Sequence, residues 1–219
     1  MNKQQVRKRI EELGIIPSVR VEYADDALFA AESVSAGGIP IVEITMTVEG
    51  ALDVVSELAK RNSGLVVGAG TVLDIDLARR CLDAGAMFLT STGLDVEIVR
   101  LAVERDVLAL AGALTPTEVV AAFKAGADFV KVFPCSMVGG PAYIRALKAP
   151  LPHVPLIASG GVNQKTADAF IHAGAAALGI GAELIPRQAI YERNAGWISE
   201  LARRFLTIVR NARSQMEEA

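Results

Sequence analysis

The chain has 219 residues, 52% of them hydrophobic, and a formal net charge of −3. This length and composition predict one sizeable domain with a packed core, and the slightly acidic balance argues against a nucleic-acid partner. The polar opening segment, the lack of an apolar run near the ~20 residues that cross a bilayer, and two cysteines without CxxC spacing predict a cytoplasmic protein with no membrane contact.

In chain order, segments with helical periodicity alternate with short apolar runs that are typical of buried strands. Asp74 and Thr115 stand where helix caps are expected, and Asn163 is expected to cap a later helix. The predicted helices are 4–13, 25–36, 74–84, 95–104, one that begins after Thr115, 163–173 and 196–213, and the predicted strands are 15–21, 40–45, 65–68, 87–91, 107–111, 128–134, 154–158 and 176–181.

A short motif marks every second strand. The sequence Ala-Gly-(Gly/Ala) precedes an apolar run at Gly37, Gly85, Gly126 and Gly174. A glycine in this place suits the C′ position, where a helix ends before the chain turns into a strand. Strands that alternate with helices eight times predict an α/β fold, a single (β/α)8 TIM barrel with an extra N-terminal helix.

The predicted domain covers residues 1–219, with the N-terminal helix at 1–13, the barrel at 14–185 and a C-terminal helical segment at 186–219. Alternation of strands and helices by itself also fits a doubly wound open sheet. In a barrel, the groups that bind and react lie at the C-terminal ends of the strands. Polar residues at those ends are therefore the candidates for a site.

The sixth expected strand carries one amine in an otherwise apolar run. Side chains alternate between the two faces of a strand, so Lys131 shares one face with Phe129 and Phe133. On an edge strand this lysine would simply reach water. Inside a covered sheet, burial favours the uncharged amine, and an uncharged amine is a nucleophile.

Glu43 lies in the second expected strand and shares a face with Ile41 and Thr45. A carboxylate among β-branched residues is costly to bury unless it is paired or used. Strands two and six stand opposite each other in an eight-stranded barrel, so Glu43 and Lys131 can project into one cavity. The pair is open to two interpretations, a structural salt bridge and a catalytic pair, and the position of both residues near strand ends favours the second.

Further polar groups stand at other strand ends. Arg20 lies at the end of the first strand and suits a substrate carboxylate, and Thr71 follows a Gly-Ala-Gly turn that lets the backbone approach a ligand. The chain is rich in glycine after strands seven and eight, where barrels often bind phosphate through backbone N–H groups. The residues expected there are Ser159, Gly160, Gly161 and Gly181.

The sequence offers little for a metal or nucleotide site. Its two histidines, His153 and His172, fall outside the expected strand ends, and it has no Walker-type loop and no Gly-x-Gly-x-x-Gly turn. We therefore expect no metal and no cofactor, while a carboxylate and water site for Mg²⁺ stays open.

Several of these segments form a recognisable set. They are Val-Glu-Ile-Thr at 42–45, Gly-Ala-Gly-Thr-Val at 68–72, Thr-Pro-Thr-Glu at 115–118, Val-Lys-Val-Phe-Pro at 130–134, Val-Gly-Gly-Pro at 138–141, Lys-Ala-Pro at 148–150 and Gly-Gly-Val-Asn at 160–163. The set resembles the 2-keto-3-deoxy-6-phosphogluconate (KDPG) and 4-hydroxy-2-oxoglutarate (KHG) aldolases, along nearly the whole chain after the opening helix.

The resemblance implies a class I, metal-independent aldolase, a lyase that is usually a homotrimer and acts on a keto acid or sugar-acid phosphate. Such an enzyme makes pyruvate and glyceraldehyde 3-phosphate from KDPG, in the Entner-Doudoroff pathway, or pyruvate and glyoxylate from KHG. By motif match, Lys131 would form the Schiff base and Glu43 would be the general acid and base. Arg20 and Thr71 would bind the substrate carboxylate. The remaining implied residues are Thr45, Thr47, Ser91 and Phe133 in the pocket, and Ser159, Gly160, Gly161 and Gly181 around the phosphate.

The chain departs from the family pattern at three pocket edges. Many members have arginine where Thr47 stands, whereas others have threonine there and arginine at the end of strand one, as Arg20 is here. Many relatives have Ser-Pro where this chain has Ser-Thr at 91–92, and Pro-Thr where it has Ala-Ser at 158–159. These departures leave open the choice among KDPG, KHG and a galactonate-derived epimer.

Two other classes of protein remain open from the residues themselves. One is a phosphate-binding barrel isomerase or epimerase, in which Lys131 and Glu43 would exchange protons without covalent attachment. The other is a ligand-binding barrel that has lost catalysis.

Overall fold

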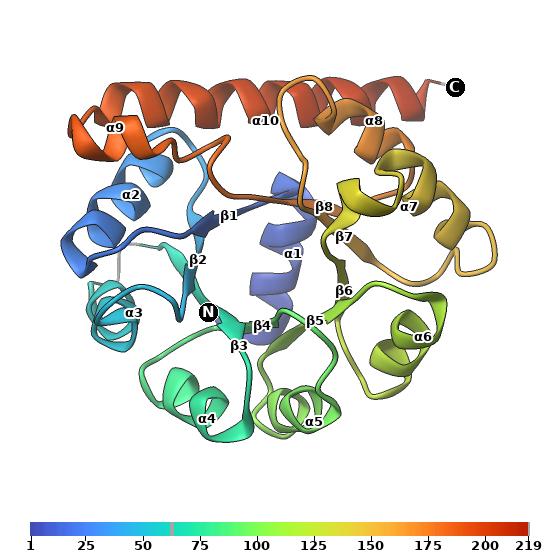
Figure 1. The fold of residues 1–219 in the computed structure, drawn as a ribbon, viewed down its shortest axis with the longest axis horizontal. Helices are drawn as coiled ribbons and strands as arrows, with labels where there is room; N and C mark the ends of the chain where they lie inside the picture. The colour runs from blue at the N-terminus through green and yellow to red at the C-terminus, as the bar shows by residue number, and fades with distance from the viewer. Residues whose placement is uncertain (62–63, 219) are drawn as a thin grey trace.

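Within residues 1–61 and 64–218, which the computed structural model describes, eight parallel strands close into a barrel (Figure 1). Each strand pairs with the next one in chain order, and β8 returns to pair with β1. Closure confirms the predicted (β/α)8 barrel and excludes the doubly wound open sheet. The strands are β1 (Ile15–Val19), β2 (Ile41–Thr45), β3 (Val66–Val72), β4 (Phe88–Ser91), β5 (Leu108–Ala113), β6 (Phe129–Val132), β7 (Leu156–Ser159) and β8 (Ala177–Ile180).

The helices lie outside the barrel, and most of them cover its outer face (Figure 1). They are α1 (Lys3–Leu13), α2 (Ala24–Ala36), α3 (Ala51–Lys60), α4 (Ile75–Asp83), α5 (Val96–Glu104), α6 (Pro116–Lys124), the short 3-10 helix η1 (Cys135–Val138), α7 (Pro141–Lys148), α8 (Ala167–His172), α9 (Arg187–Tyr191) and α10 (Ala195–Glu217). Residues 62, 63 and 219 of the predicted domain lie outside the described residues. None of the helices in the described ranges combines the length and the apolar character needed to cross a membrane.

Side-chain caps explain where several helices begin. The carboxylate of Asp74 accepts a hydrogen bond from the backbone N–H of Leu77, and Thr115 forms a reciprocal capping box with Glu118. The cap expected at Asn163 is wrong, because α8 begins after Thr166. The side-chain oxygen of Asn163 instead accepts a hydrogen bond from the backbone N–H of Lys165, in the turn before that helix.

The glycine of the repeated motif takes a left-handed conformation at three of its four occurrences. Gly85, Gly126 and Gly174 have φ of +102°, +103° and +97°. In the first motif the left-handed residue is Gly38, one place later than expected, with φ of +96°. Gly37 has a different role, because a Cβ there would lie 2.5 Å from the Cβ of Ala202 in α10. That glycine therefore lets α10 pack closely against the end of α2.

The Gly-Ala-Gly segment at 68–70 is not the turn predicted from the sequence, because β3 runs through it. A Cβ on Gly68 would lie 2.2 Å from the ring of Phe88, and a Cβ on Gly70 would lie 2.4 Å from Oε1 of Glu43. Both glycines therefore make room for larger side chains inside the barrel. The pairing of β3 with β4 shifts just beyond them, and Thr71 lies at this bulge with φ of +57°.

The N-terminal end of the barrel is covered by α1. Lys3 Nζ lies 3.0 Å from a carboxylate oxygen of Asp128, which directly precedes β6, and the guanidinium of Arg7 lies 5.4 Å from the centroid of the Phe129 ring. On the outside, α10 packs against α2 and α8 and spans that side of the molecule (Figure 1). The C-terminal end of the barrel is therefore the end available for a site.

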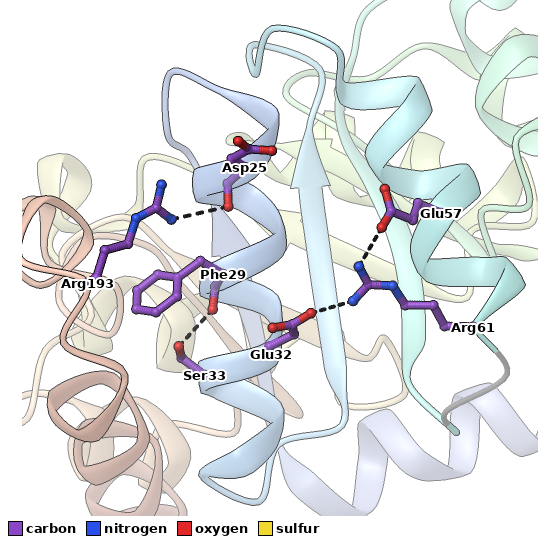
Figure 2. Close-up of polar contacts among 7 residues, drawn as sticks. All are labelled: Asp25, Phe29, Glu32, Ser33, Glu57, Arg61 and Arg193. Carbon is purple, nitrogen blue, oxygen red and sulfur yellow. Dashed lines mark hydrogen bonds and ion pairs between the residues drawn. The ribbon is translucent and has the colours of Figure 1, made fainter.

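Polar contacts on the outer surface join neighbouring helices near α2 (Figure 2). Arg61, just after α3, pairs with Glu57 of its own helix and with Glu32 of α2. Arg193 donates to the backbone carbonyl of Asp25 at 3.4 Å, and its guanidinium lies 5.1 Å from the centroid of the Phe29 ring. These groups are largely exposed, so they add little to stability. Barrel closure and the apolar core position the site.

Candidate active site

Lys131 and Glu43 meet inside the barrel. Lys131 Nζ lies 3.6 Å from Oε1 of Glu43, and their side chains are only 11% and 3% exposed. The strand of Lys131 pairs with β5 on one side and β7 on the other, so the edge-strand interpretation of this lysine is wrong. The ammonium and the carboxylate are thus buried together, as a pair at the C-terminal side of the barrel.

Ser18 and Gly70 complete the surroundings of the Glu43 carboxylate. Ser18 of β1 stands beside Glu43 in the strand pairing, and its hydroxyl donates to Oε1. Gly70 of β3 lies against the same carboxylate and has no side chain to displace it. Ser18 is a site residue that the sequence analysis did not identify. Only the register between β1 and β2 identifies it as a partner of Glu43.

Arg20 and Thr71 come together at the mouth of the barrel. Nη2 of Arg20 lies 3.4 Å from Oγ1 of Thr71, and both side chains remain accessible to solvent. Thr71 makes this contact from the β3 bulge, where its backbone is left-handed. A guanidinium and a hydroxyl that converge in this way can bind the two oxygens of a carboxylate.

Of the predicted pocket residues, Phe133 lies near the lysine, whereas Thr45 and Thr47 contact each other. The ring centroid of Phe133 lies 5.9 Å from Lys131 Nζ. Thr45 is buried and donates to the carbonyl of Val19 at 2.9 Å, while its hydroxyl lies 2.8 Å from that of the exposed Thr47.

Ser91 is buried and accepts a hydrogen bond from the backbone N–H of Gly112 at 3.0 Å. Its hydroxyl therefore joins β4 to β5. The next residue, Thr92, lines the cavity that opens above Lys131.

A cavity of about 370 Å³ opens above the lysine. The four residues expected around a phosphate all line it, and so do Lys131, Phe133 and Arg20. Those four are Ser159, Gly160, Gly161 and Gly181. Gly160 and Gly161 both have positive φ, +85° and +82°. Consecutive residues of this kind can direct backbone N–H groups toward an anion.

A second, larger cavity of about 810 Å³ adjoins the first outside the barrel mouth. Arg20 and Gly181 line both cavities, whereas Thr47, Arg187 and Tyr191 line the larger one. Lys131 of the buried pair lines the smaller cavity and not the larger one. We therefore place the chemistry there, despite the greater volume of its neighbour.

Cys135 follows the lysine strand but is a packing residue. Its side chain is fully buried and its Sγ lies 3.5 Å from the carbonyl oxygen of Gly140. Burial raises the pKa of the Cys135 thiol to about 11, so it stays protonated near neutral pH. In the described part of the chain, no three His, Cys, Asp or Glu side chains gather closely enough to hold a metal ion.

Comparison with known proteins gives matches along most of the chain. Residues 6–201 match the family model described as KDPG and KHG aldolase. The chain is 29% identical over 201 residues to the 2-dehydro-3-deoxy-phosphogluconate aldolase of Treponema pallidum, covering 91% of this chain and 95% of that one. It is 28% identical over 189 residues to the KHG/KDPG aldolase of Escherichia coli K12, with 86% and 89% covered.

Solved structures agree with these matches. The KDPG aldolase of Legionella pneumophila, captured with pyruvate as a covalent carbinolamine, is 26% identical with a TM-score of 0.84, covering 90% of this chain and 96% of that one. The 2-keto-3-deoxy-6-phosphogluconate aldolase of Zymomonas mobilis with 3-phosphoglycerate is 25% identical with a TM-score of 0.83, covering 92% and 95%.

Proposed function

The chain belongs to the KDPG and KHG aldolase family, and from this membership we propose that Lys131 and Glu43 are the catalytic pair of its Schiff-base chemistry. The protein is an aldolase and hence a lyase. Its proposed substrates are KDPG, cleaved to pyruvate and glyceraldehyde 3-phosphate, and KHG, cleaved to pyruvate and glyoxylate. The observation that carries the assignment is the buried contact of 3.6 Å between the amine and the carboxylate below an open cavity.

The amine supplies the covalent step. Lys131 Nζ passes a proton to Glu43 and, as the uncharged amine, attacks the C2 ketone of the substrate; the resulting carbinolamine loses water to give a protonated imine. This imine draws electrons as the C3–C4 bond breaks. Hydrolysis of the product imine then releases pyruvate and regenerates the amine.

The carboxylate moves the protons. Glu43 removes the proton of the C4 hydroxyl during cleavage and later returns a proton to the enamine carbon. Because Ser18 donates to Oε1 of Glu43, the carboxylate keeps its orientation while Lys131 is converted to the imine. Gly70 leaves the space that this orientation needs.

The rest of the cavity orients the substrate. Arg20 and Thr71 bind the C1 carboxylate, and Phe133 packs beside the imine. Ser159 and the glycines of the two loops that follow β7 and β8 bind the phosphate. Thr45, Thr47 and Ser91 hold the strand ends around the pocket.

We also propose a homotrimer that acts in the cytoplasm, in the Entner-Doudoroff pathway. Large apolar side chains of the kind that subunit contacts cover are exposed at Leu73 and Met137, which are 63% and 79% exposed. Both cysteines are free and buried, which suits a reducing compartment.

The decisive experiment is borohydride trapping under saturating pyruvate. The expected result is a reduced pyruvyl adduct on the peptide that contains Lys131. The matched control is Lys124→Ala, which removes an exposed lysine of α6 and should leave the adduct unchanged. Turnover measured on KDPG, KHG and a galactonate-derived epimer then ranks the substrates.

Each other outcome favours another function. A parent protein that forms no adduct, yet interconverts sugar phosphates, would be an isomerase or epimerase. A parent protein that binds keto acids without adduct or turnover would be a ligand-binding barrel. An adduct on another lysine would transfer the catalytic role to that residue.

A further inference from the structure

Thr90 of β4 has a buried hydroxyl that nothing in the protein satisfies. Its side chain is 0% exposed, and within the ranges 1–61 and 64–218 its Oγ1 is the one buried side-chain oxygen or nitrogen without a hydrogen-bond partner. An unpaired buried hydroxyl destabilises a folded protein, so it calls for an explanation. Removing it costs the fold no hydrogen bond.

The Thr90 side chain points into the barrel. A Cβ on Gly68 would meet Phe88, and a Cβ on Gly70 would meet Glu43, so these two large side chains occupy the same interior face. Thr90 stands two residues after Phe88 on the same strand and therefore shares that face. Thr90 is two residues closer than Phe88 to the C-terminal end of the barrel, where the cavity opens.

Thr90 also lies at the level of the catalytic pair. Because the strands of such a barrel are tilted, residues at the same height along the barrel axis are not the paired ones. From each strand to the next, the residue at that height lies about one position after the paired residue, and alternate strands supply the side chains of one interior layer. The contact between Glu43 on β2 and Lys131 on β6 identifies one such layer.

The strand pairings show that Thr90 is the residue of β4 at the height of Glu43. Gly68 pairs with Glu43, and one residue on, Ala69 pairs with Leu89. The next residue after Leu89 is Thr90.

Two further strand pairings lead from Thr90 to Lys131 at the same height. Thr90 pairs with Leu110; one residue on, Ala111 pairs with Val130, and the next residue is Lys131. Thr90 is therefore midway between the two catalytic groups. Continued from Lys131 through β7, the same pairings place Gly179 of β8 in this layer; Gly179 has no side chain and lines the cavity.

We propose that Thr90 is a further catalytic residue, whose hydroxyl hydrogen-bonds the oxygen on C2 of the carbinolamine and the water into which that oxygen departs. This inference rests on the proposed function. Three groups are attached to C2 besides the lysine nitrogen. The C1 carboxylate extends toward Arg20 at the mouth, and the C3 chain extends toward the glycine-rich turn after β7. The remaining group, the oxygen, is left facing the wall that contains Thr90.

The step balances with water as the only co-reactant. On entry, the C2–O bond of the carbinolamine breaks, the oxygen takes a proton from Glu43 and leaves as water, and the nitrogen lone pair forms the C=N bond. On release, that water adds to C2 of the product imine and returns its proton to Glu43. Thr90 holds the same oxygen in both directions, so it lowers both barriers.

The test compares Thr90→Val, which keeps the shape and removes the hydroxyl, with Thr90→Ser, which keeps the hydroxyl. Three quantities are measured: turnover, exchange of the C2 oxygen of pyruvate with heavy-oxygen water, and melting temperature. We expect Thr90→Val to lose about tenfold in turnover and in oxygen exchange, as for one lost hydrogen bond at a transition state, with no fall in melting temperature. Thr90→Ser should keep both rates within about twofold.

The control is Thr207→Val, which removes an exposed hydroxyl of α10 and should change neither rate. Parent-like oxygen exchange in Thr90→Val overturns the inference, as does an equal loss in Thr90→Ser. A lowered melting temperature that accompanies the loss of activity shows a structural role and also overturns it. Should Thr90→Val not fold, Thr90→Ala is measured with the same expectations. Absence of a pyruvyl adduct in the parent protein would instead refute the proposed function, so the two failures are distinguishable.

Discussion

Lys131 and Glu43 stand on opposite walls of the barrel, yet Nζ of one lies 3.6 Å from Oε1 of the other. A buried ion pair of this kind contributes little net stability, because removing two charges from water offsets their attraction. The pair is therefore better explained by chemistry than by folding. Its place below the cavity gives a substrate direct access to the amine.

Replacing the lysine should separate catalysis from folding. Lys131→Ala is expected to abolish cleavage and to lower the free energy of unfolding by about 3 kcal/mol, because Glu43 stays buried without its partner. Adding Glu43→Gln should recover much of that stability without restoring turnover. Urea denaturation and a cleavage assay measure the two effects. Near-normal cleavage by Lys131→Ala would mean that another amine reacts.

Arg20 should contribute to substrate binding more than to the chemical step. Arg20→Gln removes a charged donor beside Thr71, so we expect KM to rise by about tenfold or more, with a smaller change in kcat. Steady-state kinetics on KDPG test this. Arg79→Gln, which removes an exposed arginine of α4, is the control. An unchanged KM in Arg20→Gln would assign the carboxylate to other donors.

Replacing the two glycines of β3 should affect two different quantities, kcat for Gly70 and stability for Gly68. Gly70→Ala places a Cβ 2.4 Å from Oε1 of Glu43 and should displace this carboxylate, with a loss of about 100-fold in kcat. Gly68→Ala places a Cβ against the ring of Phe88, so it should lower stability by about 1–3 kcal/mol.

Kinetics and thermal melts of both variants are compared with Gly196→Ala, a substitution at the start of α10 that meets no atom closer than 3.6 Å. Full activity in Gly70→Ala would show that the Glu43 carboxylate can move without consequence.

The capping box of α6 predicts a small pH-dependent stabilisation. Backbone N–H groups of Thr115 and Leu114 donate to the Glu118 carboxylate and hold its pKa below the ordinary value of 4.5. A lowered folded-state pKa stabilises the fold above that ordinary value, and the effect is lost as the pH falls through the lowered pKa.

Glu118→Gln should therefore cost about 0.5 kcal/mol at neutral pH, a modest figure because solvent screens this partly exposed group. Melting curves at several pH values should show the difference between parent and variant shrinking in acid. A difference that stays constant with pH would exclude the charge as its cause.

The local features of the fold were predictable because each is recorded in a short segment. The Thr115 capping box and the left-handed glycines at 85, 126 and 174 depend on a few adjacent residues, and the structure has them as expected. The Gly-Ala-Gly segment was mistaken for a turn. Its glycines are needed because side chains from two other strands pack against them, and a local sequence pattern contains no information about such neighbours.

The sequence by itself determined the family and the alternation of eight strands with helices, and it singled out Lys131 and Glu43 as candidates for the site. These follow from local periodicity, from side-chain alternation along single strands and from motif matches. Only the tertiary structure decided which groups surround the Glu43 carboxylate and that Thr90 lies in the same layer as Lys131 and Glu43. Those relations depend on strand register and tilt, which exist only once the barrel has closed.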